Sequence, residues 1–93
     1  MGIVSGERKR AQRAAFEKAL EALKPEQVLR AEMVEARVRA EFTQAQLAQR
    51  MGTTQSAIAR LEAGRSSPNI ATLRKLAAAT GSRLVIRLDE VAT

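Results

Sequence analysis

The segment that most constrains the fold runs from Thr43 to Arg65 and reads TQAQLAQRMGTTQSAIARLEAGR. A threonine followed three residues later by a glutamine is the pattern of a capping box, in which each side chain binds the other residue's backbone N–H. The pattern predicts a helix that begins after Thr43. Gly52 can take the left-handed conformation that ends a helix, Thr54 is a suitable N-cap for the next one, and Gly64 is expected to end that second helix. Two short helices joined by a tight turn form the helix-turn-helix layout.

Apolar residues in and around this segment recur at the spacing of a helix face. A further helix is predicted from Pro25 to about Ala40, because proline suits the first position of a helix. Another is predicted from Ile70 to Thr80, with Asn69 as its N-cap and Gly81 as its end. The residues expected to face the core are Leu29, Met33, Ala36, Ala40, Leu47, Ala48, Met51, Ile58, Leu61, Ile70, Leu73, Leu76 and Ala77.

The two ends of the chain differ from this central part. Residues 7–23 are predicted to form a helix with a thin apolar stripe of Phe16, Leu20 and Leu23. After Gly81 the apolar period changes to two, which predicts one short strand. The expected organisation is an N-terminal helical arm (1–24), a helix-turn-helix domain (25–82) and a C-terminal strand and tail (83–93).

A single strand leaves its backbone groups unpaired, so it needs a partner from another chain. Antiparallel pairing of two copies of the strand has the two-fold symmetry of a homodimer. The residues expected to form that dimer contact are Leu84, Val85, Ile86 and Leu88.

Composition restricts the kind of function. The chain carries a net charge of +6, and residues 43–83 contain six basic residues and one acidic residue, so this segment should attract a polyanion. His, Cys, Trp and Tyr are absent. Most metal sites and most nucleophilic or general-base arrangements therefore lack their usual residues. We expect neither an enzyme nor a cofactor or metal. The absence of a long apolar run and of a signal peptide predicts a cytoplasmic protein without a membrane partner.

The polar residues at the two helix starts have a physical explanation. The second helix of a helix-turn-helix lies in the major groove, where Gln, Ser, Thr and Arg bind base edges. Free N–H groups at helix starts bind phosphate oxygens. An acidic side chain there would be repelled by phosphate. The segment thus favours binding of double-stranded DNA.

Between about Met33 and Gly81 the sequence resembles the Cro/cI-like (XRE-type) helix-turn-helix proteins, which include phage repressors. The resemblance implies a mainly α, lambda-repressor-like helical bundle and a contact with a DNA operator. It also implies an ion pair between Arg37 and Glu62. The residues that match the family pattern are Gln44, Leu47, Ala48, Gly52, Gln55, Ile58, Leu61, Glu62 and Gly64.

DNA contacts follow from the same resemblance. It implies that Thr54, Gln55, Ser56 and Arg60 face bases and that Gln44, Arg65, Ser66 and Ser67 hold phosphates, with Thr53 beside them. Two positions depart from the family pattern. Glu41 stands where the family has glycine, so that turn is expected to be built differently, and Thr80 replaces a leucine, which is expected to weaken the core.

A narrower resemblance concerns the layout of the whole chain. A helical segment before the motif, the stretches MVEAR and ARLEAGRSSPN, and a terminal strand are similar to HigA-type antitoxins. This implies two roles: neutralisation of a small basic RelE-like toxin, and autorepression of the operon that encodes both proteins. The alternatives are a stand-alone transcriptional regulator and a protein-binding adaptor on the same fold.

Overall fold

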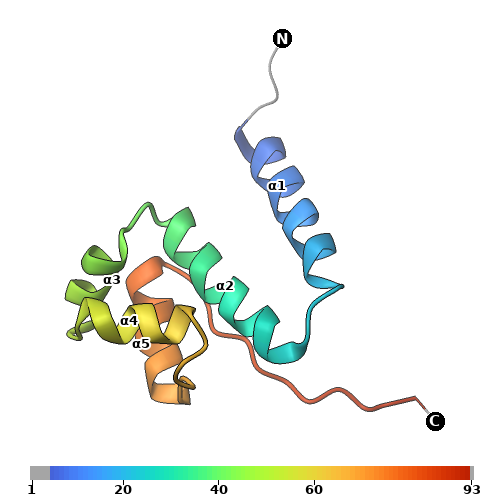
Figure 1. The fold of residues 1–93 in the computed structure, drawn as a ribbon. Coiled ribbons are helices and arrows are strands. Elements are labelled where there is room, and N and C mark those ends of the chain that lie inside the picture. The colour runs from blue at the N-terminus through green and yellow to red at the C-terminus, as the bar shows by residue number, and fades with distance from the viewer. Residues whose placement is uncertain (1–4, 93) are drawn as a thin grey trace.

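The computed structural model describes residues 5–92, which form five helices joined by short turns and followed by an irregular tail (Figure 1). Residues 1–4 of the predicted arm and residue 93 of the predicted tail lie outside the described part. The first helix ends at Leu20, three residues earlier than its pattern predicted, and a short turn leads to Pro25. The helices are α1 (Ser5–Leu20), α2 (Pro25–Arg39), α3 (Gln44–Met51), α4 (Gln55–Glu62) and α5 (Ile70–Thr80).

The predicted N-caps are confirmed. Thr43 Oγ1 accepts a hydrogen bond from the Gln46 N–H at 3.1 Å, and the Gln46 side chain accepts one from the Thr43 N–H at 2.9 Å. The Thr54 hydroxyl and the Asn69 side-chain oxygen accept N–H groups in the same way at the starts of α4 and α5. Each cap satisfies a backbone donor that the helix itself leaves free.

Helices α2 to α5 all end at a residue in the left-handed conformation. At the ends of α3, α4 and α5 this residue is the predicted glycine: Gly52, Gly64 or Gly81. At the end of α2 it is Glu41, with φ of 61°. The Glu41 N–H donates to the Val38 carbonyl at 2.9 Å and the Phe42 N–H to the Arg37 carbonyl at 3.1 Å. This pair of bonds is a Schellman motif. The expectation of a differently built turn is therefore wrong.

One core holds α2, α3, α4 and α5 together. The Leu47 and Ile58 side chains are almost completely inaccessible to solvent and lie at its centre. Phe42, Ala79 and Leu84 pack against the edge of this core. Thr80 is also buried, and its hydroxyl donates to the Leu76 carbonyl at 2.9 Å, so the polar group is satisfied. The remaining buried apolar residues are Met33, Ala36, Ala48, Met51, Leu61, Leu73, Leu76 and Ala77.

Two residues predicted to face the core are exposed. Ile70 is the first residue of α5 and is 49% exposed, because α5 enters the core only from Leu73 onward. Leu29 is 37% exposed, because the N-terminal half of α2 extends past the other core helices (Figure 1). The periodicity identified the face of each helix, but the length over which that face is covered depends on the neighbouring helices.

The prediction of a C-terminal strand is wrong for a single copy of this chain. Residues 83–92 form no regular structure, and the rest of the described chain, which consists of helices and turns, offers no strand to pair with. Backbone groups of an extended segment need such a neighbour to form a ladder. Leu84 is half-buried against the core, whereas Val85, Ile86 and Leu88 are exposed, and Leu88 is fully so at 100%.

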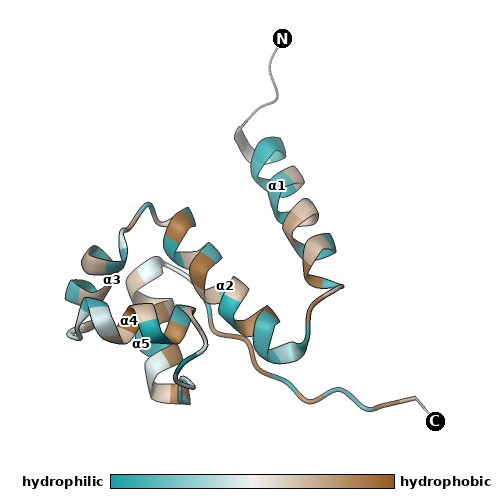
Figure 2. Ribbon diagram, viewed as in Figure 1, coloured by the Kyte–Doolittle hydropathy of each residue, from teal (hydrophilic) through white to brown (hydrophobic). Residues whose placement is uncertain are grey.

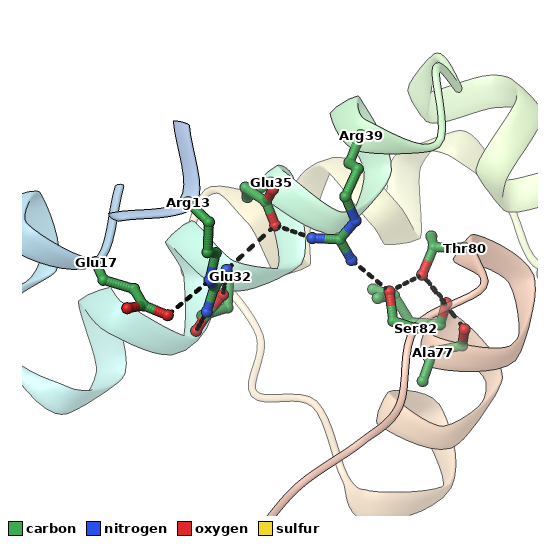
Figure 3. A network of polar contacts seen from close by, with 9 residues as sticks. Arg13, Glu17, Glu32, Glu35, Arg39, Ala77, Thr80 and Ser82 are labelled. Carbon is green, nitrogen blue, oxygen red and sulfur yellow. Dashed lines mark hydrogen bonds and ion pairs between the residues drawn. The ribbon is translucent and has the colours of Figure 1, made fainter. Parts of the chain in front are cut away.

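Helix α1 lies apart from the core and meets α2 through polar contacts. The Arg13 guanidinium donates two hydrogen bonds of 3.0 Å to Glu32 on α2 and lies 3.6 Å from a Glu35 oxygen (Figure 3). It also lies over the ring of Phe16, at 5.2 Å from the ring centre. Figure 2 shows that α1 is hydrophilic in its N-terminal half and more apolar toward its C-terminal end. One arginine therefore provides much of the attachment of the arm.

We predict that Glu41→Gly stabilises the protein. A non-glycine residue in the left-handed region is strained by about 1 kcal/mol or more, and the extra backbone freedom of glycine in the unfolded chain offsets part of the gain. A net gain of about 0.5–1 kcal/mol in the free energy of unfolding is expected in a urea titration. Glu41→Gln is the matched control, since it removes the charge and keeps the strain. If both variants gained the same free energy of unfolding, the loss of the charge and not the relief of strain would explain the effect.

Candidate nucleic-acid interface

A polar network joins the three helices that hold the helix-turn-helix. The Arg37 guanidinium on α2 donates to both carboxylate oxygens of Glu62 on α4, at 2.8 and 3.0 Å. It also donates to the Phe42 carbonyl at 2.9 Å. The Gln44 side-chain amide on α3 donates to Glu62 at 3.1 Å. The side chains of Arg37 and Glu62 are 16% and 8% exposed, so this network lies mostly out of solvent.

The structure thus brings Arg37 and Glu62 together in a two-point ion pair, the arrangement in which arginine and carboxylate bind most strongly. The hydrogen bond to Glu62 raises the pKa of Arg37 above its ordinary value, burial acts in the opposite direction, and Coulombic attraction to Glu62 adds to the rise. Arg37 therefore stays charged at any pH at which the protein is folded. Glu62 is the last residue of α4, and its carboxylate is engaged by Arg37 and by Gln44.

Gln44 is placed differently from the phosphate contact that the resemblance implied. Its side chain is half-buried and binds Glu62, so it is engaged inside the protein. Its backbone N–H, at the first position of α3, is part of the helix start that can receive an anion. The side chain therefore helps to fix the position of α3, and the backbone N–H is the group of Gln44 available to an anion.

The predicted base-contacting residues lie together at the exposed start of α4. Thr54, Gln55 and Ser56 are all exposed, and the Thr54 hydroxyl accepts the Ala57 N–H at 3.1 Å as a cap. Arg60 is exposed and follows Ser56 by one helical turn, so the two side chains share a face. The opposite face of α4 carries the buried Ile58 and Leu61. Helix α4 therefore has one face in the core and one face free for a ligand.

The remaining predicted residues line two hollows on either side of Arg60. One hollow contains Arg60, Ser56 and Arg65. The other lies between α4, the loop that follows it and α5, and contains Arg60 together with Thr53, Ser66 and Ser67. No acidic residue lines either hollow. The structure therefore groups Thr53, Ser56, Arg60, Arg65, Ser66 and Ser67 into one non-acidic surface.

The sequence analysis missed two residues of this surface, Thr72 and Lys75 on α5, which line the same hollow as Ser66 and Ser67. Sequence spacing gave no reason to place Lys75 near α4, because it stands fifteen positions after Arg60 and on a different helix. The sequence did contain one indication of this site: Thr72 and Lys75 are three positions apart and so lie on one polar face of α5.

Within residues 5–92 no group of three or more acidic side chains is arranged to hold a metal ion. None of the helices in this range has the length and apolar content that crossing a membrane requires.

We predict that Glu62→Ala destabilises the protein by about 3 kcal/mol, because Arg37 keeps its burial and loses its carboxylate partner. The free energy of unfolding in a urea titration measures this loss. Glu17→Ala is the matched control: its pair with Arg13 is exposed, and such pairs contribute roughly 0–1 kcal/mol. A loss for Glu62→Ala as small as that for Glu17→Ala would show that the network does not hold the three helices.

Comparison with known proteins gives the family. A model of helix-turn-helix proteins matches residues 33–86, which cover the C-terminal part of α2, all of α3, α4 and α5, and the first residues of the tail. No curated protein and no solved structure matches the chain. The matched range is more than half of the chain and contains both helices of the motif, their caps and the Arg37–Glu62 pair. The chain therefore belongs to the helix-turn-helix family of the XRE type, a family of DNA-binding regulators.

Proposed function

We propose that the protein is a sequence-specific repressor that binds double-stranded operator DNA through α4. It also acts as the antitoxin of a type II pair, neutralising a small basic RelE-like toxin and repressing its own operon. The observation that carries the proposal is the separation of two surfaces. The non-acidic surface around Arg60 lies on α4, on the turn and the loop that flank it and on α5, and α1 projects from the N-terminal end of α2 (Figure 1).

The DNA contact follows from the geometry of α4. With its start in the major groove, Gln55 and Ser56 reach the first base edges and Arg60 reaches bases one turn further along. Gln is suited to adenine and Arg to guanine, because each presents two hydrogen-bonding groups in one plane. Arg65, Ser66 and Ser67 in the loop after α4 then bind phosphates and set the register of α4 on the duplex.

Repression at an operator favours a dimer, since one helix-turn-helix reads few base pairs and two copies read half-sites one helical turn apart. The exposed apolar residues of the tail are the proposed contact. Val85, Ile86 and Leu88 are available for it, whereas Leu84 already packs against its own core. Burial of these side chains in a second copy would remove an unfavourable apolar surface from water.

The toxin contact is proposed for the arm. A hollow of about 1100 Å³ lies between α1 and α2, and its apolar lining includes Phe16, Val34 and Val38. Its charged lining is mixed, since Glu35, Glu41 and Glu62 lie beside five basic residues, so the apolar side chains are the proposed contact. A protein bound there would leave the start of α4 free. The stand-alone regulator is the alternative in which this hollow has no partner.

We predict that Arg60→Ala lowers affinity for the operator, taken from the region upstream of the gene, by about 1–3 kcal/mol and relaxes the preference for its sequence. Fluorescence anisotropy with the operator and with single-base variants measures both effects. Arg65→Ala is the matched control, because loss of a phosphate contact weakens all sequences alike. Unchanged affinity and preference in Arg60→Ala would favour the adaptor alternative over direct base readout.

The antitoxin role predicts a protein partner that survives removal of nucleic acid. Tagged full-length protein purified from the native host under nuclease treatment should carry a small basic protein in near-stoichiometric amount, identified by intact mass. Phe16→Asp places a charge in the apolar hollow and should release that partner while DNA binding is retained. Recovery of the bait alone, as a dimer, would place the stand-alone regulator first.

A further inference from the structure

We propose that Lys75 on α5 is an additional phosphate-binding residue, which holds the DNA backbone beside the loop that follows α4. The inference rests on the DNA-binding function proposed above and adds a residue from a helix outside the motif itself. It follows from one hollow, of about 340 Å³, that contains Lys75 together with Arg60, Ser66 and Ser67.

The chemistry of this hollow is that of an anion site. Its lining supplies two cationic side chains, Arg60 and Lys75, and four hydroxyl groups from Thr53, Ser66, Ser67 and Thr72. No carboxylate lines it. Phosphate oxygens accept hydrogen bonds from hydroxyl groups and from ammonium ions, so Lys75 and the four hydroxyl groups can donate to one phosphate while Arg60 reaches a base edge.

Another hollow of the chain has a different character. The hollow between α1 and α2 is lined by the basic residues Lys9, Arg10, Arg13, Arg30 and Arg39 and also by the carboxylates of Glu35, Glu41 and Glu62. Arg13 and Arg39 are paired with Glu35 there, so part of its positive charge is already engaged within the protein. The hollow at Lys75 differs because it combines cationic and hydroxyl side chains with no carboxylate. The same hollow adjoins the face of α4 on which the proposed base contacts lie.

No contact of Lys75 within residues 5–92 gives this side chain a role in holding the fold together. It is exposed, and it forms no salt bridge or side-chain hydrogen bond within residues 5–92. A mobile ammonium group on a four-carbon stem can reach a phosphate as a point charge without a fixed geometry. Its neighbour Arg74 is also exposed and basic but does not line this hollow, which makes the two residues a matched pair.

The test uses the full-length protein and two 20-base-pair duplexes of random sequence, one rich in A·T and one rich in G·C, in fluorescence anisotropy over a range of salt concentrations. Lys75→Ala should weaken binding to both duplexes by on the order of tenfold at low salt. The slope of log affinity against log salt concentration should become shallower by about 0.9, the loss of one phosphate contact. Lys75→Arg should keep the affinity, and Arg74→Ala should leave the slope as it is in the parent protein.

The outcomes separate the inference from the function on which it rests. If the parent protein binds neither the random duplexes at low salt nor its own upstream region, the DNA-binding function fails. If the parent binds and Lys75→Ala binds with the same affinity and slope, the role of Lys75 is wrong. The role is also wrong if Arg74→Ala makes the slope of log affinity against log salt concentration as shallow as Lys75→Ala does. It is wrong as well if Lys75→Ala weakens binding to only one of the two duplexes. A thermal melt that matches the parent shows that each variant is folded.

Discussion

The Arg37–Glu62 ion pair is the interaction on which the arrangement of the helices most depends. Helices α3 and α4 have only eight residues each, so each buries a small apolar face and apolar contacts alone leave its angle loosely determined. A planar guanidinium that binds both oxygens of one carboxylate has a fixed direction. Because Gln44 on α3 binds the same carboxylate, the position of all three helices is linked to one group.

The end of α2 is part of that network. Glu41 takes the left-handed conformation, and the chain direction that results places the Phe42 carbonyl where Arg37 donates to it. Phe42 also packs against the core. A residue that is unfavourable in its local conformation is therefore tolerated because the contacts on its C-terminal side depend on the turn. The strain at Glu41 and the hydrogen bond from Arg37 to the Phe42 carbonyl therefore both result from the turn that ends α2.

A second polar chain runs along α2 and connects the two ends of the sequence. Arg13 of α1 binds Glu32 and lies near Glu35, Glu35 binds Arg39, and Arg39 donates to Ser82 at 2.7 Å (Figure 3). Ser82 lies 2.8 Å from the Thr80 hydroxyl. Thr80, which the sequence analysis expected to weaken the core, thus has a polar role at the start of the tail. The proposed arm and dimer surfaces are both attached to α2.

The sequence by itself determined the local elements: the caps at Thr43, Thr54 and Asn69, the stops at Gly52, Gly64 and Gly81, and the polar face of α4. Caps and stops depend on residues within a few positions of one another, so local patterns are enough to predict them. Only the tertiary structure decided which faces are covered, as with the exposed Ile70 and Leu29, and whether residues 83–92 have a strand to pair with. It also decided that the Gln44 side chain binds Glu62 and that Lys75 joins Arg60, because these contacts depend on how helices far apart in sequence pack together.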